Sequence, residues 1–218
     1  MIRPFGIDEA LFIVWAIQWT LALSAIAFAG GAVGGLIVAL CRVATAKLPR
    51  YLALGYVRLF QGTPLLMQLF LVYFGLNIFG AGINPWIAAS LALTLHASAF
   101  LGEIWRGCIQ AVPSGQSEAS WALGLGYVDR MKSVVLPQAA KIAVAPTVGF
   151  LVQLIKGTSL ASIIGFVELT RAGQIINNAT FVPFKVFGLV AILYFAICWP
   201  LSLLARWMER RFAVATQR

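Results

Sequence analysis

Long apolar runs separated by short polar segments make up most of this chain. A helix needs about 20 apolar residues to cross the hydrocarbon core of a bilayer. Five runs approach that length, at about 20–41, 64–79, 86–108, 142–166 and 186–205. The pattern therefore predicts an all-α, polytopic helical membrane protein with about five transmembrane helices. A polar segment at 113–140 and a mixed loop at 167–185 separate the later runs.

The sequence also marks where helices begin and where they can approach one another. Thr63 followed by Pro64 is typical of a helix start, with Thr63 as the N-cap. The first run contains two overlapping G-x-x-x-G pairs, which permit close contact between membrane helices. The predicted packing glycines are Gly30, Gly31, Gly34 and Gly35.

Composition supports a membrane location and excludes other classes of protein. Hydrophobic residues make up 61% of the 218 residues and charged residues only 11%, whereas about a quarter of the residues in soluble domains are charged. So few charges cannot cover a water-soluble core, and so apolar a chain is not typical of disorder. We expect a single membrane domain over residues 1–218.

The net charge of +9 comes mainly from basic clusters that flank apolar runs. These clusters lie at 42–58, at 106–141 and at the end of the chain, where they comprise Arg206, Arg210, Arg211 and Arg218. Because Lys and Arg accumulate in cytoplasmic loops, the N-terminus is predicted outside, and the C-terminus and the 113–140 segment in the cytoplasm. No basic stripe is interleaved with stacking aromatics, so no nucleic-acid partner is expected.

Few residues are suited to metal or disulfide chemistry. Cys41, Cys108 and Cys198 lie in or beside apolar runs without C-x-x-C spacing, as small packing residues do. The chain has a single histidine, His96, which is expected to pack through a hydrogen bond. We therefore expect no metal site.

The 113–140 segment is the most informative polar part of the sequence. It reads as two short helices joined at Gly124, with Ala119 and Ala122 on a small face of the first and Pro137 ending the second. Its apolar residues could pack against the chain's own spans or against a separate partner. The pattern alone leaves both alternatives open.

Five positions in this segment closely resemble the EAA loop of permeases of ATP-binding-cassette (ABC) importers. That motif reads E-A-A, three residues, G, nine residues, I-x-L-P, and Ser120 and Val134 replace an alanine and the isoleucine. In the family this loop is the coupling helix that docks on a separate ATPase subunit. The resemblance assigns ATPase coupling to Glu118, Ala119, Ser120, Ala122, Gly124, Leu136 and Pro137.

Two further segments, 56–66 and 156–160, look like the permeases of polar amino-acid importers of the histidine and glutamine type. Gln61 stands where that family often has arginine, and Gly157 where it often has aspartate, which leaves the carried amino acid open. The resemblance implies a bacterial inner-membrane complex of two permease subunits, identical or paralogous, with an ATPase dimer and an extracytoplasmic binding protein.

The chain has no G-x-x-x-x-G-K-[ST] phosphate-binding loop. We therefore expect that this chain is not an enzyme and binds no cofactor, and that ATP and Mg²⁺ are held by the partner ATPase. No nucleophile–base arrangement suggests a membrane enzyme. The alternative function is a self-contained secondary transporter or channel.

Polar residues within apolar runs are candidates for a substrate pathway. Lys156, Thr158 and Ser159 interrupt the fourth run and could hold an amino-acid carboxylate, or Lys156 could reach the interface or pair with Glu168. Glu168 could bind an ammonium group or pair with Arg171. The full candidate set is Gln61, Thr63, Lys156, Thr158, Ser159 and Glu168.

Overall fold

The computed structural model describes residues 4–216, which form helices and no strand; the predicted basic residue Arg218 lies outside this range. The principal helices are α1 (Ile7–Trp15), α2 (Ile17–Val43), α3 (Lys47–Gln61), α4 (Leu65–Phe70), α5 (Leu76–Ile78), α6 (Pro85–Gln110), α7 (Ser114–Ala122), α8 (Tyr127–Arg130), α9 (Leu136–Gly157), α10 (Leu169–Thr180) and α11 (Pro183–Thr216). Two π-helical turns, η1 (Leu71–Gly75) and η2 (Met131–Val135), and a 3-10 helix, η3 (Thr158–Ile164), connect some of them.

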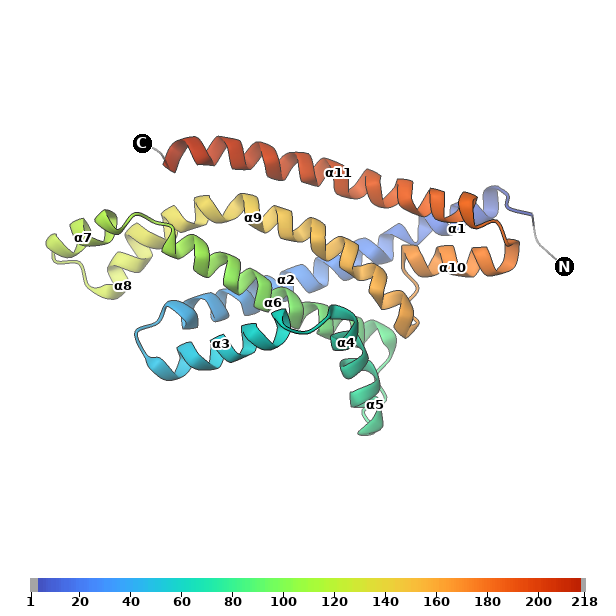
Figure 1. Cartoon of the computed structure of the whole chain (residues 1–218), viewed down its shortest axis with the longest axis horizontal. Coiled ribbons are helices and arrows are strands. Elements are labelled where there is room, and N and C mark those ends of the chain that lie inside the picture. The colour runs from blue at the N-terminus through green and yellow to red at the C-terminus, as the bar shows by residue number, and fades with distance from the viewer. Residues whose placement is uncertain (1–3, 217–218) are drawn as a thin grey trace.

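Four helical segments are long and apolar enough to cross a membrane: Ile7–Val43, Pro85–Gln110, Tyr127–Ile164 and Pro183–Arg211. A fifth span is formed if Lys47–Gln61 and Leu65–Ile78, which meet at 103°, are counted together. The long helices follow one axis, with α7 and α8 at one end and α10 at the other, while α4 and α5 turn away (Figure 1). The expected all-helical membrane fold with about five spans is confirmed.

The first span is longer than the predicted 20–41, because it begins at Ile7. A span that begins at residue 20 would place Thr20 at the membrane interface. Thr20 is instead fully buried, and its hydroxyl accepts a hydrogen bond of 3.1 Å from the backbone N–H of Leu169. A polar residue satisfied inside the bundle does not need to lie at the interface.

The second span does not begin at Thr63, as the prediction of 64–79 required. Pro64, with an extended backbone, occupies the position before α4, and the hydroxyl of Thr63 donates to the carbonyl of Leu59 at 2.8 Å. The preceding basic segment is the helix α3, which buries Ala53 and Val57, one turn apart. The predicted N-cap at Thr63 is therefore wrong.

Two further predictions about helix ends also fail. Pro137 does not end a helix, since Tyr127–Ile164 is continuous; the preceding π-helical turn η2 shifts the hydrogen-bond pattern where the proline has no N–H to donate. At 156–159 the helix tightens into η3 instead of breaking. The loop expected at 167–185 contains the helix α10.

The helices α2 and α6 pack through glycine. A Cβ atom on Gly31 would overlap the Cβ of Ala97, and one on Gly35 would lie 2.9 Å from the Cβ of Leu101. Gly30 and Gly34 face Thr94 and Ser98 of α6 just as closely, at 2.8 Å each. The four predicted packing glycines thus line the contact between the two helices.

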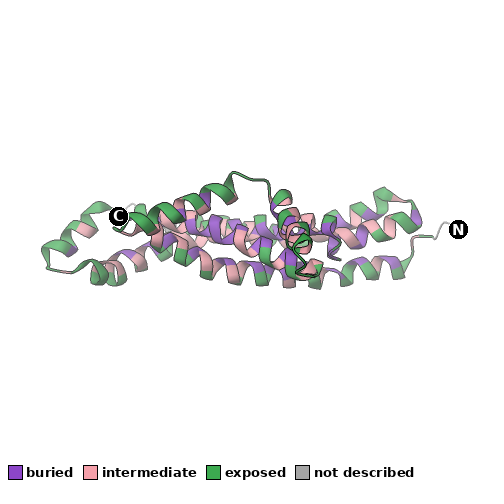
Figure 2. Ribbon diagram, turned by 90° about the horizontal axis from the view of Figure 1, so that it is seen from below, coloured by how far each residue is buried: buried purple, intermediate pink, exposed green. Residues whose placement is uncertain are grey.

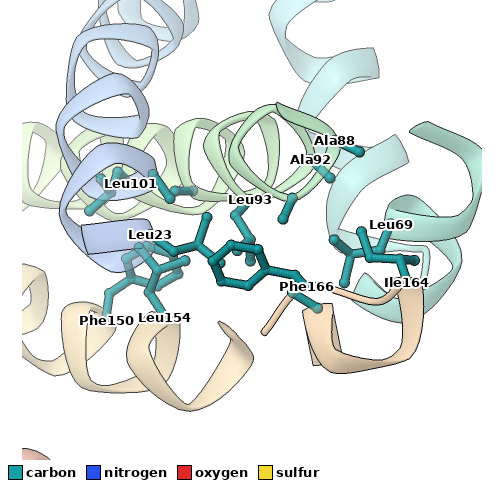
Figure 3. Packing of buried hydrophobic residues seen from close by; sticks show 14 residues of the cluster. Leu23, Leu69, Ala88, Ala92, Leu93, Leu101, Phe150, Leu154, Ile164 and Phe166 are labelled. Carbon is teal, nitrogen blue, oxygen red and sulfur yellow. The ribbon is translucent and has the colours of Figure 1, made fainter. Parts of the chain in front are cut away.

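The main apolar core lies where α2, α6, α9, η3 and α4 meet. Leu23 of α2, Leu93 of α6 and Phe150 of α9 converge there with Phe166, which follows η3 (Figure 3). Buried residues run along the inner faces of the helices, while the hairpin of α7 and α8 is mostly exposed (Figure 2).

Candidate functional site

The hairpin of α7 and α8, residues 114–130, projects from one end of the bundle (Figure 1). Helix α7 ends because Gly124 adopts a left-handed conformation, with φ of +78°. The N–H of Gly124 then donates to the carbonyl of Trp121 at 2.9 Å, and that of Leu125 donates to Ser120 at 3.1 Å. This pair of bonds is the Schellman motif, so the glycine fixes the sharp turn of the hairpin.

The hairpin is anchored to the bundle on one side. The hydroxyl of Tyr127 donates to the carbonyl of Val43, at the end of α2, at 3.3 Å. The side-chain amide of Gln138, in α9, donates to the side-chain oxygen of Gln116, in α7, at 3.3 Å. A small buried cluster, Val112, Val135 and Ala139, lies where the chain enters and leaves the hairpin. The hairpin is therefore bonded to α2 and α9.

The residues predicted to couple to an ATPase divide between the exposed and the anchored side. Glu118, Ala119, Ala122 and Gly124 are exposed, as is Pro137, while Leu136 is half-buried. Ser120 is buried, and its hydroxyl donates to the carbonyl of Ser117 at 2.8 Å. This bond satisfies the hydroxyl within the chain, so serine can occupy a position where the related motif has alanine.

Sequence reasoning missed three large apolar residues on the hairpin. Trp121 is 75% exposed, Leu123 81% and Val128 71%. They flank the turn at Gly124, and an exposed apolar cluster on a polar hairpin is typical of a protein–protein contact. All three lie within four residues of Gly124 in the sequence, and this clustering could have identified them.

Two arginines close to the hairpin share one carboxylate. The carboxylate of Glu103 contacts the guanidinium of Arg106 at 2.6 Å and that of Arg42, from α2, at 3.5 Å. Arg106 also donates to the side chain of Gln110. This cluster ties the end of α2 to α6 beside the hairpin.

At the bend between α3 and α4, the predicted residues Gln61 and Thr63 are both exposed. The bend depends on Gln68, which the sequence analysis did not single out. Its side-chain amide donates to the carbonyls of Phe60 and Thr63 at 2.7 and 3.0 Å. Its side-chain oxygen lies 3.0 Å from Nδ1 of His96. Gln68 thus satisfies carbonyls that the bend removes from the helix.

The structure separates the cluster predicted around Lys156. The lysine is exposed, whereas Thr158 is fully buried and its hydroxyl donates to the carbonyl of Ile155 at 2.7 Å. The hydroxyl of Ser159 donates in the same way to the carbonyl of Lys156. Both hydroxyls are therefore satisfied within the chain, and they do not converge with the ammonium group.

Glu168 is fully buried at the start of α10. Its carboxylate accepts hydrogen bonds from the backbone N–H of Arg171 at 2.8 Å and from the hydroxyl of Tyr194 at 2.7 Å. The guanidinium of Arg171 donates to Gln174 instead. Burial raises the pKa of Glu168 despite these bonds. The carboxylate thus caps a helix and joins α10 to α11.

Among residues 4–216, no group of three or more His, Cys, Asp or Glu side chains could hold a metal ion. The three cysteines are free thiols.

The chain was compared with known families and proteins. The sequence model described as "binding-protein-dependent transport system inner membrane component" matches residues 11–214. The probable amino-acid ABC transporter permease protein YckA of Bacillus subtilis (strain 168) is 33% identical over 208 residues, covering 95% of this chain and 92% of the relative. The glutamine transport system permease protein GlnP of Escherichia coli (strain K12) is 33% identical over 199 residues, covering 90% and 91%.

Solved structures agree with these relatives. The crystal structure of an amino acid ABC transporter with histidines has a chain that is 34% identical, with a TM-score of 0.89, covering 94% of this chain and 96% of that one. An inward-facing MetNI methionine ABC transporter chain shares the fold, with a TM-score of 0.77 at 22% identity. This chain therefore belongs to the family of inner-membrane components of binding-protein-dependent transport systems.

Proposed function

We propose that this chain is the permease subunit of an ABC importer that carries a polar amino acid across the bacterial inner membrane. The observation that carries the proposal is the hairpin of α7 and α8. It exposes Trp121, Leu123 and Val128 around the turn at Gly124, while hydrogen bonds join it to α2 and α9. Such a surface fits a docking partner better than a lipid or solvent contact.

The partner of the hairpin is an ATPase subunit, one of a pair. A second permease subunit and an extracytoplasmic amino-acid-binding protein complete the complex. ATP and Mg²⁺ belong to the ATPase, and this chain holds no cofactor. The hairpin and the C-terminus lie at the same end of the bundle (Figure 1), and the basic clusters assign that end to the cytoplasm and the N-terminus to the outside.

The helix Tyr127–Ile164 explains how the hairpin moves the spans. It runs without interruption from the hairpin, through α9, to Gly165, whose φ of +90° ends it. A displacement of the hairpin by the ATPase pair therefore moves one continuous helix that spans the membrane. The opposite end of this helix packs on the main core through η3. Movement of the hairpin is therefore passed to the core, and ATP binding and hydrolysis switch the helices between inward-facing and outward-facing arrangements.

The test is co-purification of the tagged chain with its ATPase from detergent-solubilised membranes. Gly124→Trp places bulk and backbone strain in the docking turn, so the ATPase is expected to be lost. Gly80→Trp is the matched control, since Gly80 also has a positive φ, +80°, and open space around it, but lies in the loop after α5. Retention of the ATPase by Gly124→Trp contradicts docking at the hairpin, and amino-acid uptake without any ATPase supports the secondary transporter.

A further inference from the structure

A groove of about 630 Å³ lies between α9 and α11. The lining residues recur at helical spacing, so each helix presents one face to it. They are Gly149, Val152, Gln153 and Lys156 of α9, and Ser202, Ala205 and Arg206 of α11. A Cβ atom on Gly149 would meet nothing within 4 Å, so the glycine leaves this space open.

Buried apolar residues lie beside the groove, where α9 and α11 touch. Val152, Ile155 and Cys198 are buried together where the two helices touch, with Leu201 packed against them. Charges beside such residues interact more strongly than charges in water, because the surroundings screen them less.

Two cations line the groove, Lys156 and Arg206, and no acidic residue does. In the described part of the chain neither cation makes a hydrogen bond to a side chain or an ion pair. Lys156 lies within the span Tyr127–Ile164, where a charged group is costly without a counter-charge. The groove therefore favours an anion.

The chain itself has no spare acid at membrane depth to supply that anion. Its seven acidic residues are Asp8, Glu9, Glu103, Glu118, Asp129, Glu168 and Glu209. Glu103 is paired with Arg106, and Glu168 is buried in hydrogen bonds. The other five lie near the N-terminus, on the hairpin, or beyond Arg206 on α11.

We propose that this groove binds the carboxylate of the transported amino acid, and that its charge favours neutral and acidic amino acids over cationic ones. The proposal rests on the proposed function and names the substrate class. From Gly149 to Lys156 the helix rises about 10 Å, which is long enough for an extended amino acid. Arginine and lysine both form strong charge-assisted hydrogen bonds with carboxylates. Gln153 of α9 lines the same groove and can bind the polar remainder of the ligand.

A cationic amino acid carries a positively charged side chain in addition to the α-ammonium group that all amino acids share. Like charges in a poorly screened groove repel, so arginine is expected to bind more weakly than glutamine or glutamate.

The test uses the permease–ATPase complex in nanodiscs and radiolabelled L-glutamate, L-glutamine and L-arginine. The native complex is expected to bind the first two, and L-arginine at least about tenfold more weakly. Lys156→Gln and Arg206→Gln are each expected to weaken binding about tenfold or more, the effect of losing one charged hydrogen bond. Lys156→Arg keeps the charge and restores binding. Lys185→Gln is the matched control, because Lys185 is an exposed cation of α11 outside the groove, and binding is unchanged.

Three results overturn the proposal: unchanged amino-acid binding in both groove variants, equal binding of L-arginine, or loss of co-purified anionic phospholipid alone, which makes the groove a lipid site. ATPase co-purification and ATP-driven uptake are measured on the same samples. If the native complex assembles and transports but the groove variants behave as native, only the groove assignment fails. If no ATPase assembles, the proposed function fails with it.

Discussion

Two pairs of long helices in this molecule are held together in opposite ways. Helices α2 and α6 touch backbone to backbone through glycine, and the cations at their ends near the hairpin, Arg42 and Arg106, share the carboxylate of Glu103. Helices α9 and α11 touch through side chains on one side only, and Lys156 and Arg206 remain without an acidic partner on the other. Half of the most apolar window in α6 is buried, against 17% in the last span.

We infer from this difference that the α2–α6 contact has a structural role, whereas the α9–α11 pair presents a surface for a ligand. A pair that is closely packed, and whose cations share a carboxylate, has no room left for a ligand. A pair that is open and uncompensated needs something from outside the chain. Four substitutions or conditions can test this contrast, and they follow here in order of decreasing expected effect.

The largest effect is expected for Gly31→Leu. The added side chain would collide with Ala97, so α2 and α6 must separate, at a cost of about 3 kcal/mol. Gly149→Leu makes the same change on α9, where nothing lies within 4 Å, and is expected to leave stability unchanged. The melting temperature of the purified complex in detergent is measured for both variants. Equal losses would show that the two helix pairs are packed equally closely.

The second effect is expected for Glu103→Gln. It leaves two guanidinium groups without their carboxylate, and because the side chain of Glu103 is 28% exposed, the loss should be about 1–2 kcal/mol, between a surface and a buried pair. The melting temperature measures this loss, and Glu209→Gln is the control, since Glu209 is exposed in the last helix. A Glu103→Gln protein as stable as the native one would show that the shared carboxylate does not stabilise the contact between α2 and α6.

A smaller, pH-dependent effect is expected at Glu168, which lies between two spans and bonds Tyr194 of α11. Burial raises its pKa in the folded protein, so the folded state binds the proton more tightly than the unfolded chain. Its stabilising contribution is complete below the unfolded pKa, about 4.3, and is lost as pH rises through the folded pKa. The melting temperature of the native protein should therefore fall with pH relative to Glu168→Gln, and parallel curves would contradict this.

The smallest effect on stability is expected for Lys156→Gln. This substitution removes a cation that has no acidic partner, so the melting temperature without ligand should stay the same or rise. Glu103→Gln lowers it, although both replace one charge by an amide. A clear loss of stability in Lys156→Gln would show that the ammonium group makes a stabilising interaction within the protein, which would contradict the assignment of the groove to a ligand.

The sequence predicted the spans best where apolar periodicity is uninterrupted. Residues 86–108 match Pro85–Gln110 closely, and the glycines of the first run do lie against another helix. The prediction failed where a helix is amphipathic. Helix α3 carries Lys47, Arg50 and Arg58 and was interpreted as a basic connection, although Ala53 and Val57 bury one face of it.

Contacts between distant residues could not be predicted. Lys156 and Arg206 are fifty residues apart, and only the antiparallel packing of α9 on α11 brings them to one groove. The hydrogen bond of Gln68 to His96 likewise depends on how α4 lies on α6. The resemblance of the hairpin to a known motif pointed to the turn at Gly124 as the proposed docking site, but it did not identify Trp121 and Leu123 as its most exposed apolar residues.

The bend held by Gln68 has a consequence for how the chain is made. Helix α3 and the Leu65–Ile78 segment are each too short or too polar to partition into lipid alone, and the histidine that secures their junction is synthesised 28 residues later. The second span therefore has to wait at the translocon until α6 has emerged and can receive it. Membrane insertion of this protein is then a concerted event for three helices, and ribosome-nascent chains that stop short of His96 should remain accessible to water-soluble thiol reagents at a cysteine placed in α4.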